Sequence, residues 1–112
     1  MADKIKGPDD TLSTFRLSGL QDEASRLDRH LLSCIAEECA EIIQRITKAQ
    51  RFGIEEVQPG HDLNNRARLN QEINDLIGVL DMFGFVPDDK QLKDKQLRVM
   101  EYIEHAKSVG AW

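Results

Sequence analysis

The apolar residues of this chain recur every three or four positions over long stretches, and this spacing predicts α-helices. On a helix with about 3.6 residues per turn, such residues share one face. The clearest run consists of Leu27, Leu31, Ile35, Cys39, Ile42, Ile46 and Ala49. It predicts a first helix from about Asp22 to Arg51, which Gly53 ends.

Two further helices follow. After a polar loop (54–63), Asn64 or Asn65 can cap a second helix that ends before Gly84. Asp88 then begins a capping pattern for a third helix. The expected core residues are Leu69, Ile73, Leu76, Ile77, Leu80 and Phe83 in the second helix, and Leu92, Val99, Met100, Ile103 and Ala106 in the third. The sequence therefore predicts an all-α fold, a helical bundle of three main amphipathic helices.

The N-terminal residues 1–21 predict a loose arm, with at most one helical turn around 12–17, ahead of one domain over 22–110. No apolar run opens the chain, so we expect no signal peptide, no membrane span and a cytoplasmic protein. Cys34 and Cys39 point in different directions from one helix, which predicts reduced thiols.

The size and charge of the chain limit its partners. A chain of 112 residues buries only about two-thirds of its unfolded surface, so amphipathic helices often need a second subunit. We expect a homodimer, or a higher homo-oligomer, built on the long first helices between Leu31 and Ile46. The net charge of −5 and the lack of a basic stripe argue against a nucleic acid polymer as partner.

Two acidic pairs with a spacing of three lie in the first two helices. They are Glu38 with Glu41, and Glu72 with Asp75. The spacing places both acids of a pair on one face. Packed together, the four carboxylates form either a site for a hard cation, Mg²⁺ or Mn²⁺, or a charged surface that binds nothing. The chain has 20 acidic residues, so a single pair can arise by chance.

A basic row on the third helix could complete such a site. It consists of Lys95, Arg98, Tyr102 and His105. Packed near the acids, it could hold phosphate oxygens. The alternative is a surface row paired with Asp94, Glu101 and Glu104. Lys48 and Arg51 could likewise bind phosphate or only offset the dipole of the first helix.

Several common sites are absent from the sequence. It has no Gly-rich phosphate loop, no CxxC pair and no calcium loop. None of its three histidines follows a glutamate by three positions, which argues against a di-iron bundle.

Residues 31–110 resemble a known family. The segments that carry the resemblance are EECAEIIQRITKAQRFG, NN, EINDLIGVLDM and KQLRVMEYIEHAKSVG. They are similar to the MazG-like, all-α nucleoside triphosphate pyrophosphohydrolases, especially the short single-domain forms of bacteria and phages. That family carries an ExxE motif followed by an ExxD motif, and the four acids bind the magnesium that holds the triphosphate. The loop over 54–63 is longer than in the most compact members.

The resemblance implies an enzyme that cleaves a nucleoside triphosphate, ribose or deoxyribose, to the monophosphate and pyrophosphate. It implies Glu38, Glu41, Glu72 and Asp75 as magnesium ligands and Lys95 and Arg98 as phosphate contacts. Glu37 or Glu41 would orient or deprotonate the attacking water. The competing hypothesis is a helical dimerisation module without enzymatic activity, whose charged faces are only solvated surface.

Overall fold

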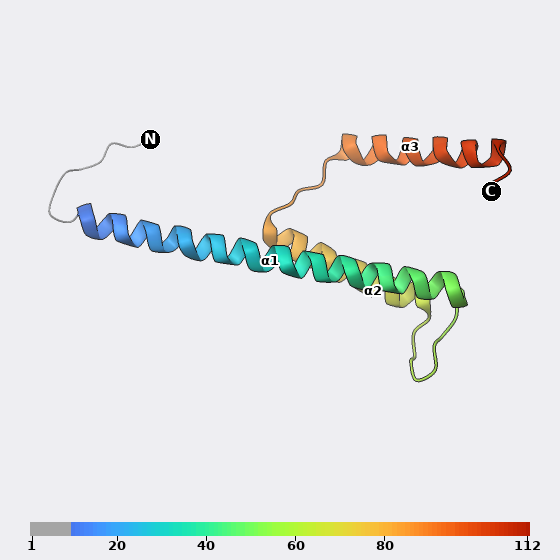
Figure 1. The fold of residues 1–112 in the computed structure, drawn as a ribbon, viewed down its shortest axis with the longest axis horizontal. Helices are drawn as coiled ribbons and strands as arrows, with labels where there is room; N and C mark the ends of the chain where they lie inside the picture. Colours follow the sequence, from blue (N-terminus) through green and yellow to red (C-terminus); the bar gives the residue numbers. More distant parts are fainter. Residues whose placement is uncertain (1–9) are drawn as a thin grey trace.

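The computed structural model describes residues 10–112, which form three α-helices (Figure 1). These are α1 (Asp10–Phe52), α2 (Asn65–Phe83) and α3 (Asp89–Ser108). Within the described residues the only β pairing is an isolated bridge between Val57 and Asn64. The fold is all-α, as the sequence predicts.

The helix ends are set by the expected capping residues. The Asn64 side chain accepts a hydrogen bond from the Ala67 amide at 2.9 Å, and Asp88 accepts one from the Gln91 amide at 3.0 Å. Both bonds satisfy amides that have no partner inside their helix. Gly84 ends α2 in the left-handed region, with φ of 94°, which favours glycine.

The expected start of the first helix is wrong. Helix α1 begins at Asp10 and not near Asp22, so residues 10–21 are helical and not a loose arm. A single glycine inside a helix costs only about 1 kcal/mol, and α1 continues through Gly19. The remainder of the expected arm, residues 1–9, lies outside the described residues.

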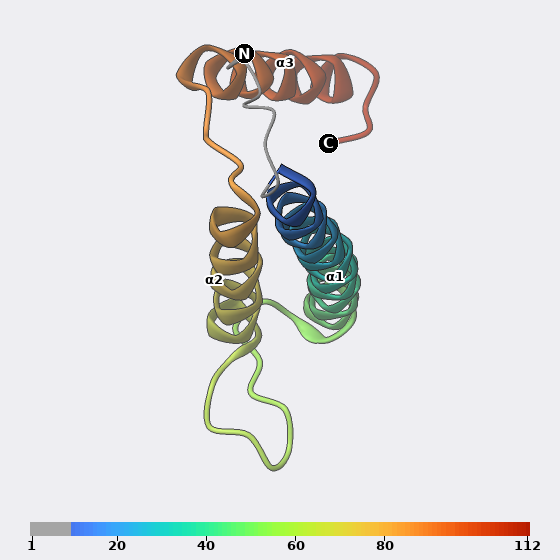
Figure 2. The same ribbon diagram turned by 90° about the vertical axis from the view of Figure 1, so that its left-hand side faces the viewer.

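Helices α1 and α2 form an antiparallel hairpin in which α2 lies along the C-terminal half of α1 (Figures 1 and 2). Leu31 is buried, and Ile35, Ile42, Leu76 and Phe83 are half-buried. Other residues of the expected stripes, namely Leu27, Cys39, Ile46, Ile73 and Ile77, are exposed. The expected stripes are therefore wider than the surface that the hairpin covers.

Helix α3 stands apart from the hairpin. The linker 84–88 carries the chain away from the end of α2, and α3 packs against neither α1 nor α2 (Figures 1 and 2). The single chain measures 73 × 40 × 18 Å, with a radius of gyration of 22.7 Å. A compact chain of this length would have a radius of gyration of about 13 Å. The chain by itself does not close into a bundle.

Two smaller expectations concern the membrane and the cysteines. No helix within residues 10–112 offers an apolar stretch long enough to cross a bilayer. Cys34 and Cys39 are both free thiols, as expected from their spacing.

Candidate metal centre

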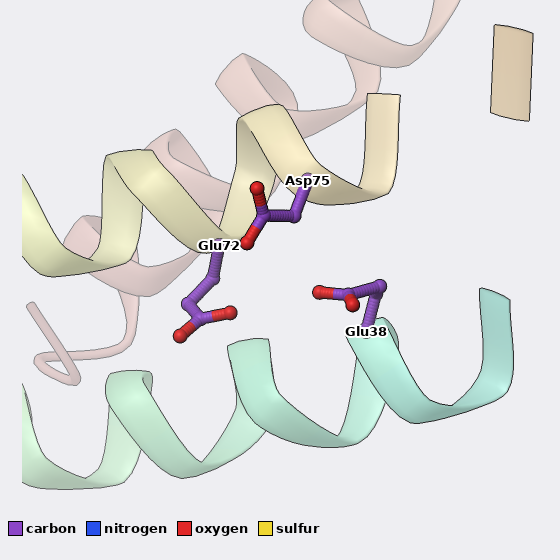
Figure 3. Close-up of side chains that lie close together, drawn as sticks. All are labelled: Glu38, Glu72 and Asp75. Atoms are coloured by element: carbon purple, nitrogen blue, oxygen red, sulfur yellow. The ribbon is translucent and has the colours of Figure 1, made fainter. Parts of the chain in front are cut away.

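Three carboxylates converge between the two helices of the hairpin (Figure 3). Glu38 projects from α1, and Glu72 and Asp75 project from α2. One carboxylate oxygen of each lies within 4.8 Å of one oxygen of each of the others. Helix packing brings them together because Glu38 borders the buried stripe of α1, while Glu72 lies on the α2 surface that faces α1. Three of the four predicted metal ligands thus meet at one place.

The cluster leaves carboxylate oxygens without partners. Oε2 of Glu38 and Oε2 of Glu72 are buried and accept no hydrogen bond. A buried carboxylate oxygen without a donor is costly, and a cation is one way to compensate it. The donor set contains only oxygen atoms, which suits a hard cation such as Mg²⁺ or Mn²⁺.

The surroundings raise the pKa of two of these acids. Burial raises the pKa of Glu38, and the negative charges of Glu41, Asp75 and Glu37 add to the effect. A hydrogen bond shared with the Glu41 carboxyl raises the pKa of Glu72, followed by burial and the nearby negative charges. Both shifts reflect negative charges crowded in a partly desolvated space. A bound divalent cation would oppose them.

The fourth expected ligand, Glu41, lies beside the cluster. It is exposed, and its carboxyl reaches the cluster through Glu72. Glu37 is also exposed, and its charge raises the pKa of Glu38. The structure therefore brings Glu41 to the edge of the three acids, with Glu37 next to Glu38 in the chain.

A polar pocket of about 340 Å³ adjoins the cluster. Glu72 forms part of its wall, together with Arg45, His61, Asp62, Leu63, Arg68 and Gln71. Nε of Arg45 lies 3.9 Å from Oε1 of Glu72, and both side chains are largely buried. The pocket thus places two guanidinium groups and an imidazole next to the carboxylates.

The loop before α2 supports this pocket through polar contacts. The buried Asn65 donates through Nδ2 to the Gly53 carbonyl at 2.7 Å and to Glu56 at 3.3 Å. Arg68 donates to Oε1 of Gln58 at 2.8 Å. These bonds tie the first half of the loop to α2, and His61, Asp62 and Arg68 line the same pocket.

Arg45, Arg68 and His61 are not among the site residues predicted from the sequence. A signal was available for the two arginines. Arg45 follows Glu41 by four positions, and Arg68 precedes Glu72 by four, so each arginine shares a helical face with an acid of the pair. His61 carries no such signal because its place depends on the loop conformation.

The predicted basic residues do not meet the acids within one chain. Lys95, Arg98 and the exposed Tyr102 lie on α3, which packs against neither helix of the hairpin. Lys48 is half-buried near the end of α1, and the Arg51 guanidinium lies 5.7 Å from the centre of the Phe52 ring. Neither of these two lines the polar pocket.

Comparison of the chain with models of known protein families, with curated proteins and with solved structures found no match.

Proposed function

We propose that this protein is a magnesium-dependent nucleoside triphosphate pyrophosphohydrolase, which converts an NTP or dNTP to the monophosphate and pyrophosphate. Its role would be to remove unwanted triphosphates from the nucleotide pool. One observation carries the proposal. Glu38, Glu72 and Asp75 converge between two helices, with two buried carboxylate oxygens that lack partners. The resemblance of the two motifs to the MazG-like family supplies the reaction.

In this proposal Glu38, Glu72, Asp75 and, by rotation of its exposed side chain, Glu41 hold Mg²⁺, with Mn²⁺ as a substitute. When bound, the cation would neutralise phosphate charge and lower the pKa of a coordinated water. The ligand set is entirely oxygen, which matches the preference of both ions.

The pocket beside the cluster suits the phosphate chain. Arg45 and Arg68 can donate charge-assisted hydrogen bonds to phosphate oxygens, and their positions beside Glu72 place those donors next to the carboxylates. This assignment replaces Lys48 and Arg51 as phosphate contacts on the hairpin. Lys95, Arg98 and Tyr102 could contribute only if α3 of a second chain reached the site.

Glu41 and Glu37 are the candidates for the general base. Both are exposed at the edge of the cluster, where an attacking water could approach. Glu41 also lies close enough to Glu72 for its carboxyl to raise the pKa of Glu72, so Glu41 is next to the ligand carboxylates. A carboxylate there can orient the water and accept its proton.

The decisive experiment is a screen of nucleoside triphosphates with Mg²⁺, followed by ion-exchange separation of the products. We expect monophosphate and pyrophosphate, with loss of turnover in the charge-neutral variants Glu38→Gln, Glu72→Gln and Asp75→Asn. Glu101→Gln, an exposed acid on α3, is the matched control. Diphosphate and orthophosphate as primary products, or full activity in two of the three variants, would contradict the proposal.

The second candidate is a dimerisation module without enzymatic activity, which the extensive exposed apolar surface favours. Thermal melting separates the two candidates. Mg²⁺ with a bound triphosphate should raise the Tm of the enzyme by mass action. A module that binds neither would melt at the same temperature with and without them.

A further inference from the structure

Arg45 borders both parts of the candidate site. Its Nε lies 3.9 Å from Oε1 of Glu72, one of the three converging acids, and its side chain also lines the polar pocket. Within the part of the chain that the structure describes, Arg45 is the only basic residue that forms an ion pair with Glu38, Glu72 or Asp75. One side chain therefore lies between the place for a cation and the place for a phosphate group.

The position of Arg45 follows from the helical repeat of α1. Arg45 follows Glu38 by seven positions and Glu41 by four, so the three residues lie on one side of the helix. The Glu72 side chain points from α2 towards α1 (Figure 3). The side chains of Arg45 and Glu72 are only 22% and 18% exposed. Their charges are therefore screened less than those of an open surface pair.

The ion pair is close, but no hydrogen bond locks it. A separation of 3.9 Å is too long for a hydrogen bond, and Oε2 of Glu72 is buried without a partner. Arg45 offsets the crowded negative charge only in part, since the interaction with the Glu41 carboxyl, followed by burial, still raises the pKa of Glu72. The guanidinium can therefore leave Glu72 without breaking a hydrogen bond between them.

A metal ion and Arg45 would compete for the same carboxylate. A guanidinium stays protonated, so Arg45 cannot give up its charge when a second cation arrives. A divalent cation held by the three acids would share Glu72 with Arg45 and would be repelled by it. A phosphate group in the adjoining pocket removes this conflict, because it offers the guanidinium an anionic partner with matching geometry.

We propose that Arg45 is a positioning residue that exchanges partners, pairing with Glu72 while the site is empty and with a phosphate oxygen once metal and triphosphate are bound. The exchange makes the cation alone bind weakly and the cation with a phosphate chain bind tightly, which is a positive coupling between the two ligands. The site thereby selects the metal–triphosphate complex over the free metal ion. This inference rests on the proposed function, because it takes the acids as metal ligands and the pocket as the phosphate site.

Binding of Mn²⁺ alone tests the first half of the exchange. Electron paramagnetic resonance of the free ion gives the Kd when Mn²⁺ is added to metal-free protein. Arg45→Met removes the charge, retains a long unbranched side chain and adds no oxygen ligand. It should tighten Mn²⁺ binding roughly threefold to thirtyfold, because it removes a largely buried positive charge next to the cation.

Two further variants control this result. Arg45→Lys restores the positive charge, so it should bind Mn²⁺ as weakly as the native protein. Arg68→Met makes the same charge change in the same pocket, but Arg68 donates to Gln58 and forms no ion pair with an acid among the described residues. It should change the affinity for Mn²⁺ little.

The preformed complex of Mg²⁺ with inorganic tripolyphosphate tests the second half. Calorimetry measures its affinity, and Arg45→Met should weaken binding roughly tenfold, because a charge-assisted hydrogen bond to phosphate is lost. The opposite signs of the two effects identify the exchange, since a distorted site would weaken the binding of both ligands.

Unchanged or weaker Mn²⁺ binding by Arg45→Met, an equal gain in Arg68→Met, or undiminished tripolyphosphate binding would overturn the exchange and leave the metal site in place. If neither the native protein nor Arg45→Met bound Mn²⁺, the exchange and the metal-dependent activity would both be wrong. If the two binding effects were as expected but no triphosphate were hydrolysed, the proposed reaction would fail and the exchange would stand.

Discussion

At the scale of single residues, the acidic cluster destabilises the folded protein when no metal is bound. Glu38 and Glu72 each have a raised pKa, so the folded chain holds protons that the unfolded chain releases. As pH rises from the ordinary value of 4.5 through the raised pKa values, the free energy of unfolding therefore falls. At pH values above both raised pKa values, the free energy of unfolding has reached its lower level and no longer changes with the titration of these two groups. Strain of this kind is typical of functional sites.

Removing either charge should therefore stabilise the metal-free protein. Glu38→Gln and Glu72→Gln should each raise the Tm at about pH 7, and the gain should shrink at about pH 4, where the native carboxyls are largely protonated in both the folded and the unfolded chain. Thermal melts in the presence of a chelator measure this effect. Glu101→Gln controls for the change in net charge. A lower Tm for both variants at neutral pH would show that the carboxylates are well compensated in the folded chain.

The arginines of the polar pocket give a second prediction at this scale. Arg45→Gln and Arg68→Gln should each raise KM for the triphosphate roughly tenfold to a hundredfold, because a charge-assisted hydrogen bond contributes about 1.5–3 kcal/mol. Steady-state kinetics with the preferred substrate measure the change. Arg66→Gln is the matched control, since Arg66 is exposed and pairs with Glu55 at 2.7 Å outside the pocket. If all three substitutions changed KM equally, the assignment of the polar pocket as the phosphate-binding site would be wrong.

At the scale of elements, the hairpin depends on how the loop joins α1 to α2. Asn65 is the one fully buried polar side chain in the part of the chain whose burial is described. Its side-chain amide donates a hydrogen bond to the Gly53 carbonyl, and its backbone amide donates one to the Glu56 carbonyl at 2.9 Å. The end of α1, the loop and the start of α2 thus meet at one residue.

Asn65→Ala should lower the free energy of unfolding by about 1–3 kcal/mol, because it removes the 2.7 Å hydrogen bond from the buried Asn65 side chain and leaves the Gly53 carbonyl with only the 3.3 Å bond from the Glu56 amide. Urea denaturation measures the loss. Asn70→Ala, at an exposed position on the same helix, should change stability little or raise it slightly, since alanine is the better helix former. If the two variants were equally stable, the Asn65 contacts would contribute nothing to the hairpin.

At the scale of the whole molecule, the chain is elongated and leaves many large apolar side chains exposed, and we expect a second copy of the chain to cover them. Leu31 is the one buried apolar side chain in the part of the chain whose burial is described. Stability that arises between chains depends on concentration. The Tm should therefore rise across a roughly hundredfold increase in protein concentration, with the melting profile otherwise unchanged. A Tm independent of concentration would indicate a core contained in one chain.

The sequence by itself determined the three helices and most of their ends, but not the start of α1. Apolar spacing and local capping depend on residues within a few positions of each other, so Gly53, Asn64, Gly84 and Asp88 could be assigned before any packing was known. The expected arm was wrong over residues 10–21 because the single glycine there, Gly19, disfavours a helix too weakly to stop a long one. The pairing of Glu38 with Glu72 and Asp75 was predicted from their helical faces.

Only the tertiary structure decided which parts of those faces are covered. The spacing of apolar residues places them on one face of a helix but does not show which element covers that face. In the structure, one part of the wide apolar stripe on α1 is buried against α2 and the other part is exposed. Likewise, the basic row on α3 had suitable spacing, but the linker carries that helix away from the acids. Arg45, Arg68 and the imidazole of His61 instead line the pocket with Glu72, because the loop and the hairpin packing bring together residues that lie far apart in the sequence.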